Sequence, residues 1–148
     1  MLGRVAMVNK KTDSNAQDIL DINNLIVSYG FHVDACDADA VADLWTEDGE
    51  YIVHGVGRWT GREALKEMVQ SDLHQSYVSA GCLHFMGPPQ TVVTGDEARV
   101  HSNTLLIKYS AGHFEIDRVS DNTWLLVRTD CGWKVQCREN TLLAPKPA

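Results

Sequence analysis

The architecture depends on three consecutive segments: "EARVHSNTLLIKYS" (residues 97–110), "HFEIDRVSDNTWLLVRT" (113–129) and "GWKVQCRENTLL" (132–143). Apolar and polar residues alternate through much of each segment, which is the period of a strand with one buried face. Turn residues separate the segments at Ala111-Gly112 and at Asp130-Cys131-Gly132. The three segments are therefore predicted to form consecutive antiparallel strands.

The residues before these strands have the period of helices. Apolar positions recur at spacings of three and four in residues 18–33, which predicts a first helix with one buried stripe. A second, short helix is expected after Asp37, because an aspartate side chain can cap a helix N-terminus. In "TGREALKEMVQSDL" (60–73), Thr60 and Glu63 have the spacing of a capping box and predict a third helix.

Helices followed by long antiparallel strands define an α+β fold, in which one curved sheet covers a helical layer. A chain of 148 residues has the length of a single domain. Residues 1–14 are mixed and polar and are expected to form a flexible arm, residues 15–143 the domain, and residues 144–148 a C-terminal tail. Gly30 is expected to weaken the first helix, because glycine costs about 1 kcal/mol relative to alanine.

The composition argues against several classes of partner. Thirteen basic and twenty acidic residues give a net charge of −7, which repels nucleic-acid phosphates and anionic lipid. The N-terminus lacks the apolar core of a signal peptide, and no apolar run has the length of a membrane span, so a cytoplasmic protein is expected. The four cysteines show neither a C-x-x-C pair nor zinc-ligand spacing. They are expected to be reduced and to bind no structural metal.

His84 is the first candidate functional residue. It lies in "CLHFMG" (82–87), where Leu83 and Phe85 point to one face of the expected strand and His84 to the other. Both faces are largely apolar, which predicts a strand that is covered on both sides. A histidine in this position is either a hydrogen-bonded core residue or the acid–base group of a pocket, and the spacing leaves both interpretations open.

The other candidates also have ordinary structural explanations. Asp34 follows the last apolar residue of the first helix and could be a loop or capping residue. Tyr29 fits the buried stripe of that helix, and Arg138 shares a strand face with polar residues that could face solvent. The sequence contains no serine-nucleophile elbow, no phosphate-binding glycine loop and no zinc-protease motif. Acid–base chemistry is the enzymatic hypothesis that remains.

The order of elements resembles the SnoaL-like proteins of the nuclear-transport-factor-2-like (NTF2-like) superfamily, over roughly residues 15–143. Three stretches carry the resemblance: "HVDACDADAVADLWTEDGEY" (32–51), "TGREALKEM" (60–68) and "VRTDCGWKVQCREN" (127–140). They are similar to the family's helix–turn–helix, third helix and last hairpin. The resemblance implies a cone-shaped fold, in which a curved antiparallel sheet wraps over three N-terminal helices. It identifies the fold better than the activity, since the superfamily includes enzymes, binding proteins and structural domains.

A sharper similarity is to the lyases of this superfamily that use an aspartate–histidine dyad: scytalone dehydratase, bile acid 7α-dehydratase and hexachlorocyclohexane dehydrochlorinase. Their histidine lies early in the strand after the third helix, as His84 does, and their aspartate ends the first helix, as Asp34 does. Tyr29 matches a tyrosine five residues before the aspartate of bile acid 7α-dehydratase. Arg138 matches an arginine of the final strand.

The resemblance implies a cofactor-independent, dehydratase-like lyase that acts on a hydrophobic cyclic molecule, with no metal or organic cofactor. His84 would be the base, and Asp34 would orient its ring and stabilise the imidazolium. Tyr29 and Arg138 would bind the oxygen on which charge develops. The alternatives are a proton shuttle like ketosteroid isomerase or a polyketide cyclase, and a non-catalytic domain like a ligand-binding protein or a dioxygenase small subunit.

The expected fold leaves a broad outer face on the sheet. Apolar strand positions that point away from the helices usually mark an interface, and family members assemble through this face. Some of the apolar strand positions, such as Leu105, Ile107, Leu125 and Val127, must face away from the helices. We therefore expect a homo-oligomer, either a dimer or a trimer.

Overall fold

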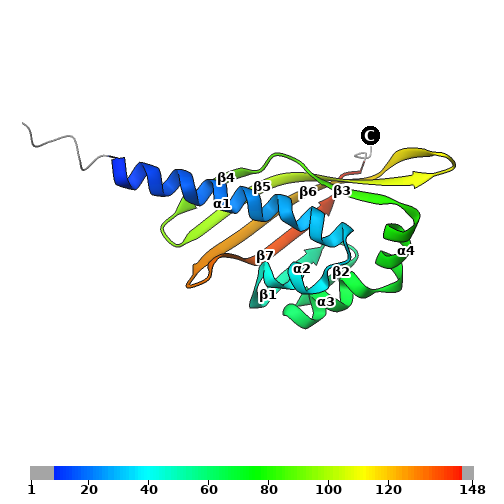
Figure 1. Cartoon of the computed structure of the whole chain (residues 1–148), viewed down its shortest axis with the longest axis horizontal. Coiled ribbons are helices and arrows are strands. Elements are labelled where there is room, and N and C mark those ends of the chain that lie inside the picture. Colours follow the sequence, from blue (N-terminus) through cyan, green and yellow to red (C-terminus); the bar gives the residue numbers. More distant parts are fainter. Residues whose placement is uncertain (1–8, 145–148) are drawn as a thin grey trace, which may run out of the picture.

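The computed structural model describes residues 9–144, which form four helices and one seven-stranded sheet (Figure 1). The helices are α1 (Asn9–Asp34), α2 (Ala38–Asp43), α3 (Arg62–Gln70) and α4 (Asp72–Ala80). The strands are β1 (Trp45–Val53), β2 (Gly57–Thr60), β3 (Cys82–Met86), β4 (Gln90–Thr94), β5 (Glu97–Ser110), β6 (His113–Thr129) and β7 (Gly132–Leu142). The order across the sheet is β2-β1-β7-β6-β5-β3, and β4 also pairs with β5.

The predicted α+β class, with one curved sheet over helices, is confirmed, and the sheet itself is mixed. The neighbouring strands pair in the antiparallel sense except β1 and β7, which are parallel. A parallel pair needs a long crossover connection. Here the connection contains α3, α4 and the strands β2 to β6, which return the chain to the side of β1.

Two helical boundaries differ from the prediction. Helix α1 begins at Asn9, within the residues predicted as a flexible arm, and residues 1–8 lie outside the described part of the chain. The predicted third helix is divided in two, because the backbone of Ser71 is extended. The Ser71 hydroxyl oxygen accepts a hydrogen bond from the backbone N–H of His74 and so caps α4.

The predicted caps had different outcomes. Asp37 caps α2 as expected, since its side chain accepts a hydrogen bond from the backbone N–H of Ala40. The predicted capping box at Thr60 is wrong. Gly61 is the N-cap of α3 and provides no side-chain bond, and the Thr60 hydroxyl donates instead to Glu50 across the β1–β2 hairpin.

The hydrophobic core lies between the helices and the inner face of the sheet. Helix α1 runs along the sheet and contacts β3 and β4, whereas α2, α3 and α4 gather at one end (Figure 1). The side chains that fill this space include three tryptophans and two tyrosines beside aliphatic residues. Within residues 9–144, no helix combines the length and the hydrophobicity that a membrane crossing requires.

Two β-bulges change which face a side chain points to. In β7, Val135 pairs with Leu126 and Cys137 with Leu125, so Gln136 is an extra residue. The buried positions are therefore Trp133 and Val135 before Gln136, and Arg138 and Asn140 after it. A similar irregularity in β6 lies at Asp117, because Arg118 pairs with Leu106 and Ile116 with Ile107.

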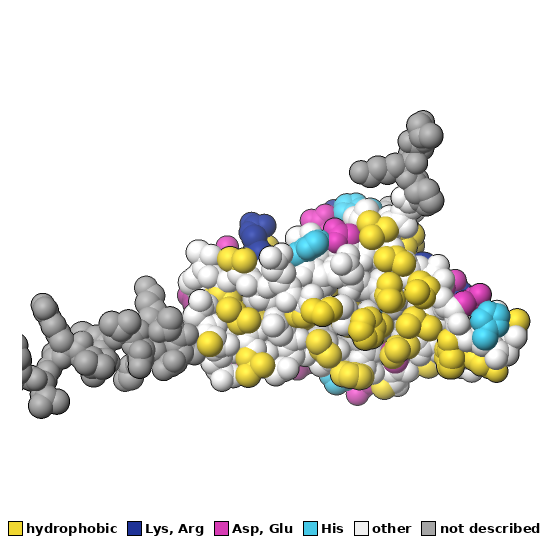
Figure 2. Space-filling model, turned by 90° about the horizontal axis from the view of Figure 1, so that it is seen from above, with side chains coloured by type: hydrophobic (Ala, Val, Ile, Leu, Met, Phe, Trp, Pro, Cys, Tyr) yellow, Lys and Arg dark blue, Asp and Glu magenta, His cyan; other side chains and the backbone are white. Residues whose placement is uncertain are grey.

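The outer face of the sheet carries an apolar patch. Phe85, Leu105 and Val119 are aligned across β3, β5 and β6, as are Leu83, Ile107 and Ile116, so the six side chains share one face. Leu83 and Phe85 are 42% and 49% exposed, so the expectation that β3 is covered on both sides is wrong for the single chain. Figure 2 shows hydrophobic side chains gathered on the face seen from above.

Candidate active site

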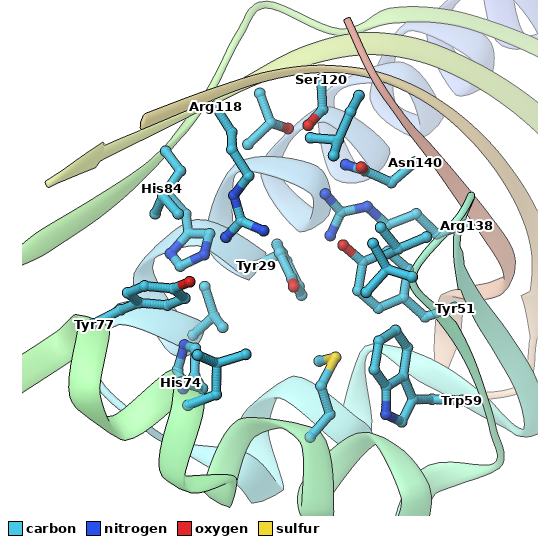
Figure 3. A pocket seen from close by; sticks show the side chains of 18 of the residues that line it. Tyr29, Tyr51, Trp59, His74, Tyr77, His84, Arg118, Ser120, Arg138 and Asn140 are labelled. Atoms are coloured by element: carbon cyan, nitrogen blue, oxygen red, sulfur yellow. The ribbon is translucent and has the colours of Figure 1, made fainter. Parts of the chain in front are cut away.

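A cavity of about 190 Å³ lies between the inner face of the sheet and α1, α3 and α4 (Figure 3). Most of its lining is apolar or aromatic, including Val33, Trp59, Met68 and Leu106. The polar groups come from different elements: Tyr29 of α1, Tyr51 of β1, His74 and Tyr77 of α4, His84 of β3, Thr104 of β5, Arg118 and Ser120 of β6, and Arg138 and Asn140 of β7. Polar groups that converge in a largely apolar cavity are typical of a small-molecule site.

Asp34 and His84 lie within hydrogen-bond distance of each other at the edge of this cavity. His84 Nδ1 lies 2.6 Å from Asp34 Oδ1, and the backbone N–H of His84 donates to Asp34 Oδ2 at 2.9 Å. The side chain of His84 is 15% exposed and that of Asp34 is 16% exposed. Because an ionised carboxylate only accepts hydrogen bonds, Nδ1 carries the proton and the neutral ring keeps its lone pair on Nε2. His84 lines the cavity, and Asp34 lies behind it.

Gly30 allows the close approach of α1 and β3 that brings the pair together. A Cβ atom on Gly30 would lie 2.5 Å from the carbonyl oxygen of His84 and 3.0 Å from Met86 Cγ. Any other residue would push the helix away from the strand. The glycine that weakens the helix in isolation is therefore explained by packing, one turn before Asp34.

Cys82 is a third member of this group. Its thiol donates to Asp34 Oδ1 at 3.7 Å, and burial raises the pKa of the thiol to about 11. In the described part of the chain, Asp34, Cys82 and His84 are the group whose ligand atoms lie close enough to hold a metal ion. The Cys82 thiol and His84 Nδ1 are both hydrogen-bonded to Asp34 Oδ1. A protonated thiol is also a poor metal ligand. The contacts fit a hydrogen-bonded cluster better than a metal centre.

Arg138 is a buried cation whose contacts are neutral. It is 2% exposed, and its Nε and Nη2 both donate to Asn122 Oδ1, at 3.0 and 2.9 Å. The guanidinium carbon lies 4.4, 4.5 and 4.3 Å from the ring centres of Tyr29, Tyr51 and Trp124. Nη1 is buried without a hydrogen-bond partner among residues 15–144. This donor is available to a ligand oxygen in the cavity.

Tyr29 lies on the buried stripe of α1 and also lines the cavity. It can therefore be both a core residue of the helix and a contact of a ligand. It is 3% exposed and packs edge-on against Trp45 and Trp124. Burial raises the pKa of its phenol, with Tyr51 contributing in the same direction. The neutral hydroxyl can donate a hydrogen bond to an oxygen on which negative charge develops.

The structure therefore brings His84, Tyr29 and Arg138 to one cavity with Asp34 behind His84, and it adds residues that the sequence did not indicate. Arg118 was not among the predicted site residues, and it lies on the inner face because it pairs with Leu106, which pairs with His84 on the other side. His74 and Tyr77 belong to α4, which was not predicted as a separate helix. Their spacing of three residues on a helix was the available signal, since it places them on one face.

Residues 14–139 match the SnoaL-like domain family, and the chain belongs to this family within the NTF2-like superfamily. Among solved structures, an NTF2-like protein with a cystatin-like fold from Novosphingobium aromaticivorans is 35% identical. Its TM-score is 0.92, over 97% of this chain and 94% of that chain. The family and its fold are thus established for most of the chain.

More distant structures share the fold alone. A candidate scytalone dehydratase from Novosphingobium aromaticivorans is 23% identical with a TM-score of 0.71, over 90% of this chain and 89% of that chain. A candidate aromatic ring hydroxylase from the same species is 22% identical with a TM-score of 0.69, over 88% and 92%. No curated protein matches the chain.

Proposed function

We propose that the protein is a cofactor-independent lyase that eliminates water from a hydrophobic cyclic molecule. The observation that carries the proposal is the contact between His84 and Asp34 at the wall of a mostly apolar cavity. Such a cavity limits the access of water and strengthens the electrostatic interaction of the pair. The designation of one distant structural neighbour as a candidate scytalone dehydratase supports the same class of reaction.

His84 Nε2 removes a proton from the carbon next to a substrate carbonyl. Asp34 accepts the hydrogen bond of Nδ1 and stabilises the imidazolium that forms. Arg138 Nη1 and the Tyr29 hydroxyl donate to the oxygen of the developing enolate. As the carbon–carbon double bond forms, the β-hydroxyl group leaves with the proton that His84 returns to it. One C–H bond and one C–O bond are broken, and water is released.

The same contacts are compatible with two alternative functions. A proton shuttle, like that of ketosteroid isomerase or a polyketide cyclase, needs the base and the enolate donors but expels no group. A ligand-binding domain without turnover needs only the cavity, and the distant neighbour designated a candidate aromatic ring hydroxylase keeps this possibility within the fold. Product analysis separates the three functions.

The test uses two probe ketones. 3-Hydroxy-1-tetralone is a cyclic β-hydroxy ketone whose dehydration yields 1-naphthol, and 3-cyclohexen-1-one reports migration of a double bond without elimination. We expect the wild-type protein to form 1-naphthol and the His84→Ala variant to form none above background. Double-bond migration without 1-naphthol would favour the proton shuttle. Equal product formation by wild type and His84→Ala would overturn both enzymatic functions.

A further inference from the structure

His74 is a second histidine in the cavity, and its hydrogen bond determines which ring nitrogen is free. His74 Nδ1 lies 2.7 Å from the carbonyl oxygen of Val69. A carbonyl oxygen only accepts, so Nδ1 carries the proton and Nε2 of the neutral ring is an acceptor. Burial lowers the pKa of His74, with the nearby His84 contributing in the same direction, and this keeps the ring neutral.

The free nitrogen of His74 has no partner among the side chains and backbone groups that the structure describes. In residues 15–144, whose side chains are described, two buried side-chain polar atoms lack a hydrogen-bond partner: His74 Nε2 and Arg138 Nη1. Both residues line the same cavity. Their requirements are opposite, because His74 Nε2 needs a donor and Arg138 Nη1 needs an acceptor. Unmatched polar atoms cost free energy in a buried site, and a ligand of the right polarity removes that cost.

The position of His74 relates it to the proposed chemistry. Its ring centre lies 5.8 Å from that of His84, and Figure 3 shows both rings on the same side of the cavity with Arg138 across from them. A ligand that presents a carbon to His84 therefore has a neighbouring group beside His74. A hydroxyl that donates to His74 becomes more electron-rich at oxygen and is a poorer leaving group. The hydroxyl beside His74 is thus one that stays on the substrate.

We propose that His74 is a specificity-determining residue whose Nε2 accepts a hydrogen bond from a retained hydroxyl of the substrate. Together with Arg138 Nη1, it selects cyclic compounds with a hydroxyl on the α4 side and a carbonyl or carboxylate oxygen on the β7 side. The proposal deepens the proposed function, on which it rests for the substrate carbon beside His84. Whether the site prefers a ligand with a hydroxyl donor can be measured by binding alone, without any turnover.

The test compares 2-naphthol with 2-fluoronaphthalene, which has a similar shape but no hydroxyl donor. The dissociation constants are measured by fluorescence titration for wild type, His74→Asn, His74→Gln and His84→Asn. In His74→Asn, the side-chain amide lies near the position of Nδ1 and can still donate to Val69, but no atom occupies the position of Nε2. Comparing the ratio of the two constants between proteins cancels the different hydration of the two probes.

We expect the preference for 2-naphthol to fall by about 10-fold from wild type to His74→Asn, the size expected for one hydrogen bond. His74→Gln, whose longer side chain reaches the position of Nε2, should retain part of it. The proposal would be overturned if the ratio of the two dissociation constants were the same in His74→Asn as in wild type. It would also be overturned if wild type showed no preference for 2-naphthol. A preference lost only in His84→Asn would overturn it as well, because the hydroxyl would then bind the other histidine.

Nitrogen-15 NMR of the imidazole rings gives a second measurement that needs no variant. The resonance of the unprotonated His74 Nε2 should shift when 2-naphthol is added and stay in place with 2-fluoronaphthalene. Equal responses to the two probes would contradict the proposed contact. If the protein catalyses no elimination, these binding results still stand. If the binding results contradict the role of His74, the role of Asp34 and His84 is not affected, so the two proposals can fail separately.

Discussion

Asp34 is the last residue of α1, and its carboxylate is hydrogen-bonded to both the ring and the backbone N–H of His84, fifty positions further along the chain. Oδ1 lies 2.6 Å from His84 Nδ1, and Oδ2 accepts from the backbone N–H of the same residue at 2.9 Å. The carboxylate is thus held at two points by one strand. This arrangement orients the imidazole before any substrate binds, which is a requirement for efficient base catalysis.

We predict that His84→Ala lowers the rate of elimination by at least about 10³-fold, because it removes the base. Asp34→Asn should also lose most activity, since an amide can stabilise the wrong tautomer. The double variant should be little worse than His84→Ala, because the two residues act as a unit. The measurement is kcat/KM with the substrate found in the ketone test. His101→Ala, at an exposed position outside the cavity, is the control. Additive losses would mean that the pair is structural.

Gly30→Ala should destabilise the protein, although alanine is the better helix former. A Cβ atom would lie 2.5 Å from the His84 carbonyl oxygen, and overpacking of this kind costs about 1 to 3 kcal/mol. We expect a lower melting temperature together with a larger loss of activity than the loss of stability explains, since Asp34 moves with the helix. Asn24→Ala, on the exposed side of α1, should be neutral or stabilising. If Gly30→Ala were as stable and active as wild type, the close approach would be unimportant.

Arg138→Met should weaken ligand binding without destabilising the fold. Arg138 is a buried cation with neutral neighbours, and replacing such a charge by an apolar side chain of similar size is often neutral or stabilising. Asn122 Oδ1 keeps the hydrogen bond that Asn140 donates. We expect at least about 10-fold weaker binding of 2-naphthoate, measured by fluorescence titration, with an equal or higher melting temperature. Arg99→Met, at an exposed position of β5, is the control. Unchanged naphthoate binding would remove Arg138 from the site.

The outer patch, consisting of Leu83, Phe85, Leu105, Ile107, Ile116 and Val119, predicts a dimer or a trimer. Ile116 is 58% exposed in the single chain, and a contiguous apolar surface on a sheet is typical of an interface. Light scattering at micromolar concentration should give two or three times the monomer mass of 16.4 kDa. Ile116→Glu should shift the assembly towards the monomer, whereas His113→Glu, at the tip of the hairpin, should not. A monomeric wild-type protein would contradict the prediction.

Much of the fold could be predicted from local patterns. The long β5, β6 and β7 follow from alternation and from the turn residues between them, and the stripe of α1 follows from spacings of three and four. Asp37 caps α2 as predicted. The break at Ser71 was missed, because the apolar spacing continues through it and only the backbone departs from the helix.

The candidate site was predicted through a family resemblance, and its remaining residues needed the structure. Asp34, His84, Tyr29 and Arg138 occupy positions that the resemblance indicated, whereas their spacing alone left a structural explanation for each. The spacing of His74 and Tyr77 was too weak a signal to identify a cavity residue, since the burial of His74 depends on the packing of α4 against β3 and β5. Leu83 and Phe85 were expected to be covered, and in the single chain they are exposed.

The sequence by itself determined the types and the order of most elements, although not the separate α4, because helix and strand periods are properties of neighbouring residues. Only the tertiary structure decided that Arg138 points inward. Simple alternation places Arg138 on the face of Lys134 and Gln136, but the bulge at Gln136 reverses the alternation in the second half of β7. A bulge is set by how β7 pairs with β6 and β1, strands that lie elsewhere in the chain. Asp34 and His84 likewise meet only because α1 packs against β3 at Gly30.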